Sequence, residues 1–475
     1  MLDEAVICAI STAPGTGAIA VVRLSGKGCF ALADEVFISP SGKKLADCLP
    51  NTVHFGQLQE GEDVIDEVLV AVFRAPHSFT GEDSVEISCH GSVYIQQRIL
   101  QLLVNKGARL AAPGEFTQRA FLNGKMDLSQ AEAVADLIAS SSSAAHKMAL
   151  RQMKGGFSAE LIKLRAELLH ITSLLELELD FSEEDVEFAD RSELRRIAGN
   201  IEKLLTRLCR SFSLGNVIKN GVPVAIVGNT NVGKSTLLNT LLKEDKAIVS
   251  DVAGTTRDTI EDTINLQGIA FRFIDTAGIR HTDDIVENIG IERTFAKIGE
   301  ASVVLLLTDL SRGADCFESY YSQVKEKISP EAELLIVLNK TDKAQDILTT
   351  LETIKLLTSG EKIIAISAKT GANLEQLTDE LVNTVNTHAL HTGDVIVSNI
   401  RHYEALSHAR DAVIRAIAGL DSGLSGEFIS QDIRECLHYL GEITGEITTD
   451  EVSVISLNIS VLGSRLVKIL IINVL

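Results

Sequence analysis

The sequence predicts a multidomain protein that combines α/β and all-α parts. Three observations support this prediction: the length of the chain and two changes of hydrophobic pattern, near residues 128 and 216. A chain of 475 residues is too long for one ordinary hydrophobic core. Residues 128–215 have long helical periodicity with hardly any Gly or Pro, whereas residues 216–380 alternate apolar strands with helices. We therefore expect a doubly wound α/β unit inserted in a helical bundle.

The domain boundaries follow from the same patterns. Residues 1–120 contain short β-like runs punctuated by Gly and Pro, then a helical segment at 92–106, and are expected to form a small α+β domain. The first helical part is expected at 121–215 and the α/β unit at 216–380. Helical sequence returns after about residue 381, with LTDELVNTVNTHAL as its first segment, and the second helical part is placed at 381–475. The two helical parts should pack together as one bundle.

Composition excludes several classes of protein. Lys and Arg number 44 against 65 Asp and Glu, a net charge of −21, so any RNA contact must use a local basic patch. The absence of Trp and an aromatic content of 4% argue against a module that stacks single-stranded bases. The seven cysteines lack CxxC or zinc spacing, and neither a signal peptide nor a membrane-spanning helix is expected from the N-terminal residues and the short apolar runs. A cytoplasmic protein with reduced thiols and no membrane contact is predicted.

The stretch 228–235, GNTNVGKS, has the pattern of a phosphate-binding loop. It follows the apolar run 222–227 and leads into helical sequence at 236–242, and the pattern is informative only in this strand–loop–helix context. Its glycines let successive backbone N–H groups face a phosphate, its lysine can reach the β and γ oxygens, and its serine can ligate Mg²⁺. The candidate nucleotide-binding residues here are Gly228, Asn231, Val232, Gly233, Lys234, Ser235 and Thr236.

Four further motifs follow strands in the order expected of a guanine-nucleotide-binding domain. The segment AGTTRD at 253–258 offers a threonine for Mg²⁺, and DTAG at 275–278 offers an acid for the metal shell and a glycine N–H for the γ-phosphate. In NKTD at 339–342, Asp342 can accept hydrogen bonds from guanine N1–H and the 2-amino group, donors that adenine lacks. SAK at 367–369 supplies backbone N–H for the base oxygen. The candidates are Thr255, Thr256, Asp275, Gly278, Asn339, Lys340, Asp342, Ser367, Ala368 and Lys369.

Hydrolysis is less directly predicted than binding. Ile279 follows the glycine of DTAG, where Ras-like enzymes carry the glutamine that orients water. Glu287, in the polar segment RHTDDIVENIG just beyond, is the candidate for this task, although an arbitrary exposed glutamate is more often only solvated. Another acidic run, at 183–190, is most simply a solvated connection between helices, with a metal site as the less favoured alternative because no His accompanies it.

Three charged residues of the N-terminal part lie beside glycines or at the end of an apolar run. They are Arg23, Glu86 and Lys125. On residue type alone, each would be a solvated charge at a loop edge.

Nearly the whole chain resembles the MnmE (TrmE) family of tRNA-modification GTPases. The resemblance rests on TGEDSVEISCHG at 80–91, PGEFTQRAFLNGKMDLSQAEAVADLI at 113–138, the five nucleotide motifs and LGEITGEIT at 440–448. The N-terminal signatures are the most specific, because many GTPases share the nucleotide motifs alone. The resemblance implies an N-terminal folate-binding, aminomethyltransferase-like domain that also dimerises, and a Ras-like G domain inserted into a helical bundle.

The resemblance also implies particular roles for residues of this chain. Arg23, Glu86 and Lys125 would bind 5-formyltetrahydrofolate or a related tetrahydrofolate. Ser235 and Thr256 would hold Mg²⁺, and Glu287 would orient the attacking water with Arg280 in the same loop. Asn231 would ligate K⁺ by its side chain, with help from the backbone around Ser250, Val252 and Thr255. The charge of K⁺ could then stabilise the transition state as an arginine finger does.

By the same resemblance, the chain would be a potassium-dependent, homodimeric GTPase that forms a heterotetramer with an FAD-dependent MnmG/GidA-family protein. Together they would add a carboxymethylaminomethyl group to C5 of the wobble uridine in certain tRNAs. One feature departs from the family, whose members end in Cys-Ile-Gly-Lys. Here the tail 452–475 reads as an apolar strand or disordered end without that cysteine, through divergence or an altered reading frame. A regulatory GTP switch without tRNA chemistry and a ribosome-assembly GTPase are the alternatives.

Overall fold

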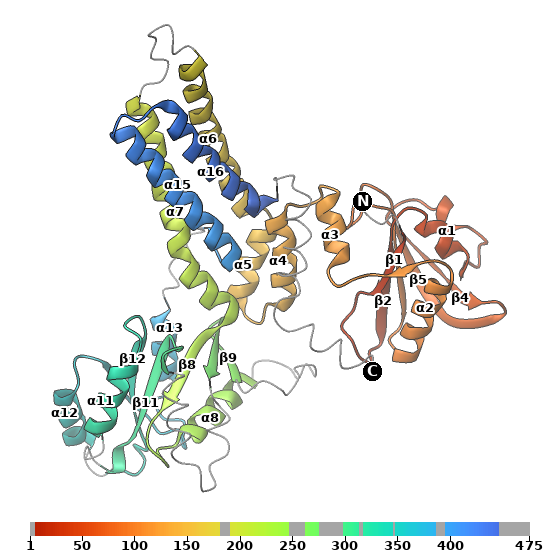
Figure 1. Ribbon diagram of the computed structural model, residues 1–475. Helices are drawn as coiled ribbons and strands as arrows, with labels where there is room; N and C mark the ends of the chain where they lie inside the picture. Colours follow the sequence, from red (N-terminus) through yellow and green to blue (C-terminus); the bar gives the residue numbers. More distant parts are fainter. Residues whose placement is uncertain are drawn as a thin grey trace. The chain divides into compact units, whose positions relative to one another are not determined.

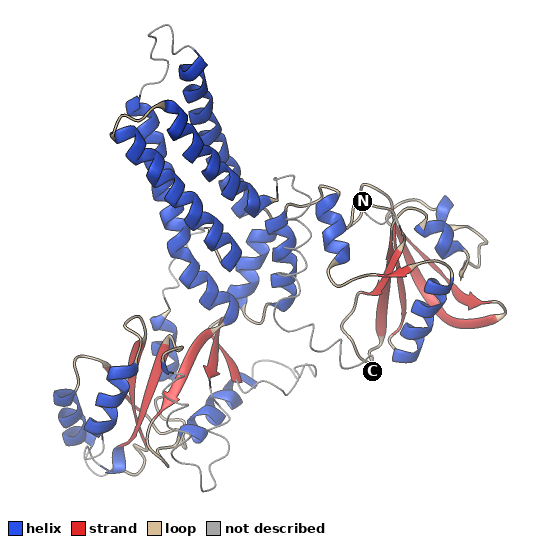
Figure 2. Ribbon diagram, in the orientation of Figure 1, coloured by secondary structure: helices blue, strands red, loops and turns tan. Residues whose placement is uncertain are grey.

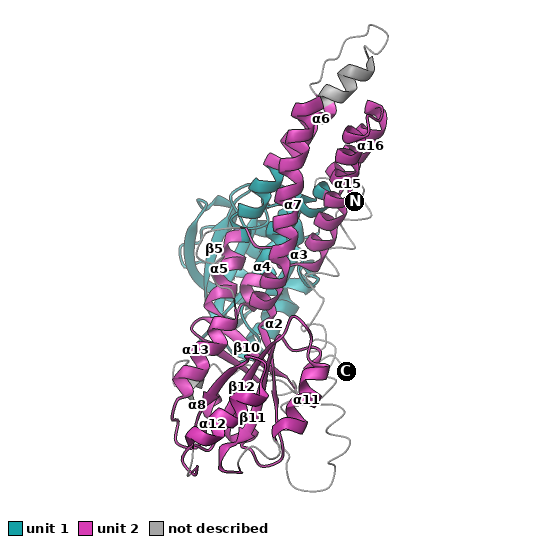
Figure 3. Ribbon diagram, turned by 90° about the vertical axis from the view of Figure 1, so that its left-hand side faces the viewer, with its two compact units in different colours: residues 1–135, 152–162, 440–475 teal, residues 136–151, 163–439 magenta. Residues whose placement is uncertain are grey.

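The structure is a computed structural model that describes residues 5–180, 191–246, 262–274, 298–312, 317–344, 347–385 and 395–445. The chain divides into two compact units, which Figure 3 shows in different colours. Unit 1 comprises residues 1–135, 152–162 and 440–475, and unit 2 comprises residues 136–151 and 163–439.

Unit 1 contains a seven-stranded sheet with the strand order β3-β4-β5-β6-β2-β1-β7 (Figures 1 and 2). Adjacent pairs are antiparallel except β1 and β7, which run parallel. The short strands predicted within residues 1–120 and the helix predicted at 92–106 are confirmed. The elements are β1 Ile7–Ile10, β2 Ile19–Ser25, α1 Cys29–Asp34, β3 Phe37–Ile38, the 3-10 helix Leu45–Asp47, β4 Thr52–Glu60, β5 Asp63–Phe73, β6 Ser84–His90, α2 Val93–Asn105, β7 Arg109–Leu110 and α3 Glu115–Leu122.

The two faces of this sheet differ in burial. Alternate residues of the central strands, such as Val22, Val70 and Ile87, are buried in a core to which α2 contributes Ile99 and Leu103. The alternation follows from the period of two in a strand, which sends neighbouring side chains to opposite faces. The other face keeps large apolar side chains exposed, namely Ile19, Val53, Phe55 and Leu69.

Unit 2 joins long helices to an α/β sheet. In α7, residues such as Ala198, Ile201 and Leu205 are buried at helical spacing, and α7 packs along α15. At this contact the Phe212 and Tyr403 rings stack at a centroid separation of 4.7 Å. The bundle helices of the chain, some of which extend into unit 1, are α4 Leu128–Ala139, α5 Ser143–Met153, α6 Gly156–Asp180, α7 Arg191–Asn220, α15 Ile400–Asp421 and α16 Gly426–Thr444.

The α/β sheet has six strands in the order β13-β12-β11-β8-β10-β9 (Figure 1). All neighbours are parallel except β9 and β10. Its elements are β8 Val222–Val227, α8 Lys234–Lys246, β9 Asp262–Leu266, β10 Ile269–Ile274, β11 Val303–Asp309, the 3-10 helix Leu310–Arg312, α11 Phe317–Lys327, β12 Glu333–Asn339, α12 Ile347–Leu357, β13 Lys362–Ala365 and α13 Leu374–Thr384.

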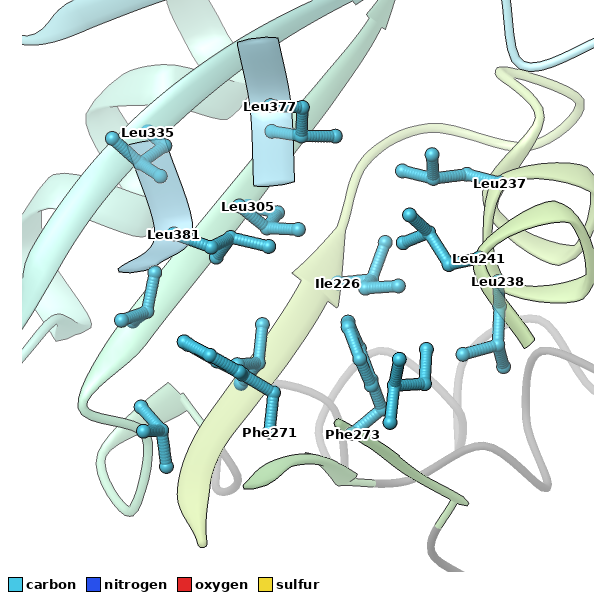
Figure 4. Packing of buried hydrophobic residues seen from close by; sticks show 14 of the residues in the cluster. Ile226, Leu237, Leu238, Leu241, Phe271, Phe273, Leu305, Leu335, Leu377 and Leu381 are labelled. Carbon is cyan, nitrogen blue, oxygen red and sulfur yellow. The ribbon is translucent and has the colours of Figure 1, made fainter. Parts of the chain in front are cut away.

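Helices cover both faces of this sheet. Residues of α8 and α13 pack with Ile226 and Leu305 on one face (Figure 4), and residues of α11 and α12 pack with Val227 and Leu306 on the other. Burial on both faces explains why these strands read as continuous apolar runs. Because all the parallel strands point the same way, the loops that follow their carboxyl ends meet at one edge of the sheet.

One helical prediction is wrong in its packing. The helical pattern assigns LTDELVNTVNTHAL to the returning bundle, but this segment begins within α13. Leu377 and Leu381 of α13 are buried against the α/β sheet. A helical pattern shows which face is apolar but not which partner covers it. The described cysteines are free and buried, as expected; Cys316 lies outside the described residues. The acidic run 183–190 and the tail 452–475 also lie outside them. None of the helices in the described part is long and apolar enough to cross a membrane.

Candidate nucleotide site and N-terminal site

The phosphate loop connects β8 to α8 and requires glycine at its two ends. Gly228 has a φ of 151°, and a Cβ there would lie 2.3 Å from the Leu307 carbonyl oxygen. Gly233 has a φ of 102°, and a Cβ there would lie 2.3 Å from the Asn339 amide nitrogen. Only glycine combines these left-handed conformations with such close neighbours. The loop therefore has the tight backbone that the GNTNVGKS pattern predicts.

Lys234 lies over the loop. Its Nζ donates hydrogen bonds to the carbonyl oxygens of Gly228 at 2.6 Å and Asn229 at 3.0 Å. Burial lowers the pKa of Lys234 below its usual value, because a low-dielectric environment disfavours the charged form. An anion bound in the loop would offset this cost, so the ammonium suits the phosphate-binding role predicted for it.

Asn339, at the end of β12, joins two nucleotide motifs through its side chain. Its Nδ2 donates to the Val232 carbonyl oxygen at 2.8 Å, and its Oδ1 accepts from the Ala368 N–H at 2.9 Å. The residue is 2% exposed, so both hydrogen bonds are shielded from water. The phosphate loop and the SAK segment are consequently held through one buried amide.

Lys340 makes a second connection to the phosphate loop. Its Nζ donates to the Asn231 carbonyl oxygen at 2.6 Å and lies 2.7 Å from the carboxylate of Asp309, at the end of β11. Burial alone would raise the pKa of Asp309, but hydrogen bonds from Lys340 and Ser311 outweigh it and lower the pKa. Sequence reasoning missed Asp309, because its partner is distant in the chain and the strand ending TD matches no nucleotide motif.

Asp342 is placed for base recognition. Its Oδ1 accepts a hydrogen bond from the Ser367 hydroxyl at 2.7 Å, which lowers the pKa of Asp342 and keeps the group ionised. Lys369 and Lys343 also contribute to this lowering. The NKTD and SAK motifs are thus brought together, as the sequence predicts, with the carboxylate available to accept from a base.

Several predicted site residues lie outside the described residues: Ser250, Val252, Thr255, Thr256, Asp275, Gly278, Arg280 and Glu287. Of the predicted metal ligands, Ser235 and Asn231 are described. Asn231 is exposed with a φ of 62°, and its side-chain amide forms no hydrogen bond with the described part of the chain. In that part, no group of three or more His, Cys, Asp or Glu could hold a metal ion by itself. The donors nearest the phosphate loop are instead a hydroxyl and an amide, oxygen ligands that suit Mg²⁺ and K⁺ when phosphate oxygens complete the shell.

In unit 1, Arg23 and Glu86 form a pair on the outward face of the sheet. They are register partners on β2 and β6, and the Arg23 guanidinium reaches Glu86 Oε1 at 2.7 Å. The guanidinium also lies over the rings of Phe79 and Phe116, at 5.0 and 5.5 Å from their centroids. A flat, charged group flanked by aromatic rings could bind a planar ligand with a polar edge. The two phenylalanines were missed by sequence reasoning, because their contact with Arg23 depends on non-local folding.

Lys125, the third predicted N-terminal residue, contacts the loop between β5 and β6. Its Nζ donates to the Pro76 carbonyl oxygen at 2.9 Å, and its side chain passes Gly81. Nearby, buried Arg119 is bridged to Glu82 at 3.2 Å and Glu115 at 3.1 Å. Sequence reasoning also missed this cluster, which fixes the segment 113–125 against the loop before β6.

Comparison with known proteins gives the same family for both ends of the chain. The family described as "GTP-binding protein TrmE N-terminus" matches residues 6–125, and the "MnmE helical domain" matches residues 128–453. Among solved structures, a GTP-binding protein from Sulfolobus solfataricus in complex with GDP is 22% identical and covers 47% of this chain and 67% of its own, with a TM-score of 0.26. That likeness is too weak to support any argument.

Full-length relatives are much more similar. A protein named tRNA modification GTPase MnmE from Parabacteroides distasonis is 56% identical over 94% of this chain and 97% of its own length. The proteins of that name from Bacteroides thetaiotaomicron and Christiangramia forsetii are 55% and 53% identical, over 95% and 94% of this chain and 97% and 96% of their own lengths. With these similarities, the chain belongs to the MnmE family of tRNA modification GTPases.

Proposed function

We propose that this protein hydrolyses GTP in a potassium-dependent manner and uses the cycle to drive tRNA modification. The observation that carries the proposal is the buried Asn339 amide, which links the phosphate loop to the SAK segment. These segments also follow one another in the order expected of a guanine-nucleotide-binding domain. The family relationship supports both the nucleotide and the tRNA substrate.

At the phosphates, this chain would supply preorganised charge. Lys234 already lies along the loop and would exchange the Gly228 and Asn229 carbonyls for phosphate oxygens. Ser235 and Thr256 would hold Mg²⁺, which neutralises phosphate charge. Glu287 would orient the attacking water, with Arg280 in the same segment.

The potassium site would use the amide of Asn231 together with backbone groups around Ser250, Val252 and Thr255. Exposure of the Asn231 side chain and its freedom from other described hydrogen bonds support this role. A bound K⁺ supplies positive charge next to the phosphates, where a GTPase without an arginine finger needs it.

The N-terminal unit would bind a tetrahydrofolate such as 5-formyltetrahydrofolate. Arg23, between Phe79 and Phe116, would contact the planar ring system, and Glu86 would hold Arg23 and accept from ring N–H groups. Lys125 would add positive charge for the glutamate end of the folate. On the same face of the sheet, Phe55 of β4 is about half exposed, at 53%. An apolar face of this kind favours a homodimer that covers it.

The complete reaction would add a carboxymethylaminomethyl group at C5 of the wobble uridine, in the cytoplasm, together with an FAD-dependent protein of the MnmG/GidA family. The alternative is a regulatory GTP-binding dimer without tRNA chemistry. A ribosome-assembly GTPase would leave the N-terminal signatures at 80–91 and 113–138 unexplained.

Steady-state GTP hydrolysis in KCl and in NaCl tests the nucleotide part of the proposal. We expect faster turnover in KCl, and Asn231→Ala should remove that advantage while Asn229→Ala, a matched change in the same loop, keeps it. Glu287→Ala should bind GTP normally and lose most turnover. Equal rates in both salts would refute the potassium role, and an unchanged kcat in Glu287→Ala would show that another group orients water.

Analysis of the tRNA product separates the leading proposal from the regulatory alternative. The full chain is incubated with the FAD-dependent partner, GTP, a tetrahydrofolate donor and unmodified tRNA, and the wobble nucleoside is identified by mass spectrometry. Modification at C5 supports the complete reaction. GTP hydrolysis without modified nucleoside would support the switch.

A further inference from the structure

The strongest unassigned surface feature is a basic strip on α7. This helix carries seven Lys and Arg against two Glu, in a chain whose net charge is −21. Lys203, Arg207 and Arg210 are exposed and follow one another at intervals of four and three residues. That spacing places them on one side of the helix, within about 11 Å of its length.

The strip faces away from the bundle. The buried residues of the same region of α7, among them Ile201, Leu205 and Leu208, lie on the opposite side, where the helix packs against its neighbours. The strip is extended at its two ends by exposed Asn200 and Ser213, which are polar and uncharged. Nothing in the described part of unit 2 therefore covers this side of α7 at these positions.

The three strip residues differ from three other arginines of the same bundle, which are paired. Arg195 pairs with Asp421 at 2.7 Å, Arg410 with Asp411 at 2.9 Å and Arg415 with Asp432 at 2.9 Å. By contrast, Lys203, Arg207 and Arg210 form no side-chain hydrogen bond or ion pair within the described ranges. A paired arginine contributes little net potential, whereas three unpaired cations in a row create a local positive field.

We propose that the α7 strip, Lys203, Arg207 and Arg210, binds the sugar–phosphate backbone of the tRNA substrate. This inference rests on the proposed function, which supplies an RNA substrate to a protein whose overall charge repels one. Unpaired Lys and Arg side chains at regular spacing match a row of phosphates, and such contacts position an RNA without reading its sequence.

The composition of the strip favours RNA over other anionic partners. The exposed side of α7 between Asn200 and Ser213 carries no exposed aromatic or aliphatic side chain, and these are the residues that protein interfaces and membrane-surface helices need. A surface that offers only cations and hydrogen-bond donors suits a solvated phosphate backbone.

Binding of a fluorescently labelled tRNA transcript to the full-length protein tests the proposal. The variant Lys203→Gln/Arg207→Gln/Arg210→Gln is compared with Arg195→Gln/Arg410→Gln/Arg415→Gln, which changes the net charge equally by removing paired arginines. We expect the strip variant to bind tRNA on the order of 10- to 100-fold more weakly at physiological salt. The slope of log Kd against log salt should become shallower by about two to three. The control variant should bind within a few-fold of wild type, and GTP hydrolysis without tRNA should be unchanged in both.

The possible failures are distinguishable. If wild-type protein binds tRNA and the strip variant matches its Kd and slope, the strip inference is wrong while the proposed function stands. Equal weakening in both variants would show a dependence on total charge only and would also overturn the inference. Loss of binding to phosphatidylserine vesicles with tRNA binding retained would assign the strip to a membrane surface instead. If wild-type protein binds no tRNA, the tRNA part of the proposed function fails as well.

Discussion

The nucleotide loops of unit 2 and the Arg23–Glu86 pair of unit 1 both present charged side chains at the edge or face of a sheet, but different contacts hold them. The nucleotide loops follow separate parallel strands and are tied to each other by Asn339 and Lys340. Arg23 and Glu86 face each other directly across neighbouring antiparallel strands. A change in one nucleotide loop should therefore disturb the others, whereas a change at Arg23 should remain local.

The largest effect is expected from Gly233→Ala. The new Cβ would lie 2.3 Å from the Asn339 amide nitrogen, in a backbone with a φ of 102°. Crowding and left-handed strain together should cost about 3 kcal/mol or more, which corresponds to at least ~100-fold weaker GTP binding. Titration with a fluorescent GTP analogue measures this loss.

Gly360→Ala is the matched control for this substitution. Gly360 has nearly the same φ, 103°, but a Cβ there would meet no atom within 4 Å. It should lower thermal stability slightly and leave GTP affinity unchanged. If both variants bind GTP equally well, contact between the phosphate loop and Asn339 is not needed for binding.

Asn339→Ala should have the next largest effect, because it leaves the Val232 carbonyl and the Ala368 N–H without their partner. Each unsatisfied buried group costs about 1–3 kcal/mol, so GTP affinity should fall by ~10- to 100-fold. Asn373→Ala is the control, since Asn373 donates one exposed hydrogen bond, to the Ala365 carbonyl. Comparable affinities of the two variants in isothermal titration would contradict the linked-loop interpretation.

How far the sequence predicts each site depends on the same difference in construction. Four of the nucleotide motifs, GNTNVGKS, DTAG, NKTD and SAK, could be located because each is short, continuous and follows a strand, as with GNTNVGKS after β8 and NKTD after β12. The connections between them could not. Asn339 was expected to belong to the base site, and its hydrogen bond to Val232 links residues 107 positions apart. Asp309 belongs to no motif, and its connection to the nucleotide loops comes from its ion pair with Lys340.

The N-terminal site was harder to predict for a physical reason. Taken alone, Arg23 and Glu86 are ordinary charges in short strands, and only the family resemblance singled them out. The register of β2 and β6 makes them neighbours, and register is set by packing over the whole sheet. Their residue types were visible in the sequence, whereas the cation–π contacts with Phe79 and Phe116 were not.

Arg23→Ala should weaken 5-formyltetrahydrofolate binding by ~10-fold, the scale of one charged hydrogen bond or a cation–π contact. GTP affinity and the KCl-stimulated hydrolysis rate should not change, because Arg23 makes none of the contacts that join the nucleotide loops. Arg98→Ala is the control, since Arg98 is likewise paired with a glutamate of the same unit, Glu60, at 2.6 Å. Because the protein contains no Trp, the absorbance of the folate can be followed with little protein background. Calorimetry measures the same affinity independently. A fall in GTP affinity in Arg23→Ala would show that the pair is not local.

The smallest effect is expected at Glu361, which precedes β13 at the end of the strand away from the nucleotide loops. Burial alone would raise the pKa of Glu361, but hydrogen bonds from Lys325, from its own backbone N–H and from Tyr321 outweigh it and lower the pKa to about 2. A lowered folded-state pKa stabilises the fold above the unfolded value of 4.5, and this stabilisation is lost as the pH falls toward 2.

Glu361→Gln should therefore be slightly less stable than wild type at pH 7 and should lose less of its stability between pH 4.5 and 2, the window set by the two pKa values. Glu352→Gln, a change at an exposed glutamate of α12, should follow the wild-type pH dependence. Urea unfolding across this pH range measures both. GTP affinity at pH 7 should be unchanged in Glu361→Gln, because its contacts join α11 to the start of β13 and not one nucleotide loop to another. A drop in GTP affinity as large as that of Asn339→Ala would mean that contacts throughout the α/β sheet, and not only those between the loops, control nucleotide binding.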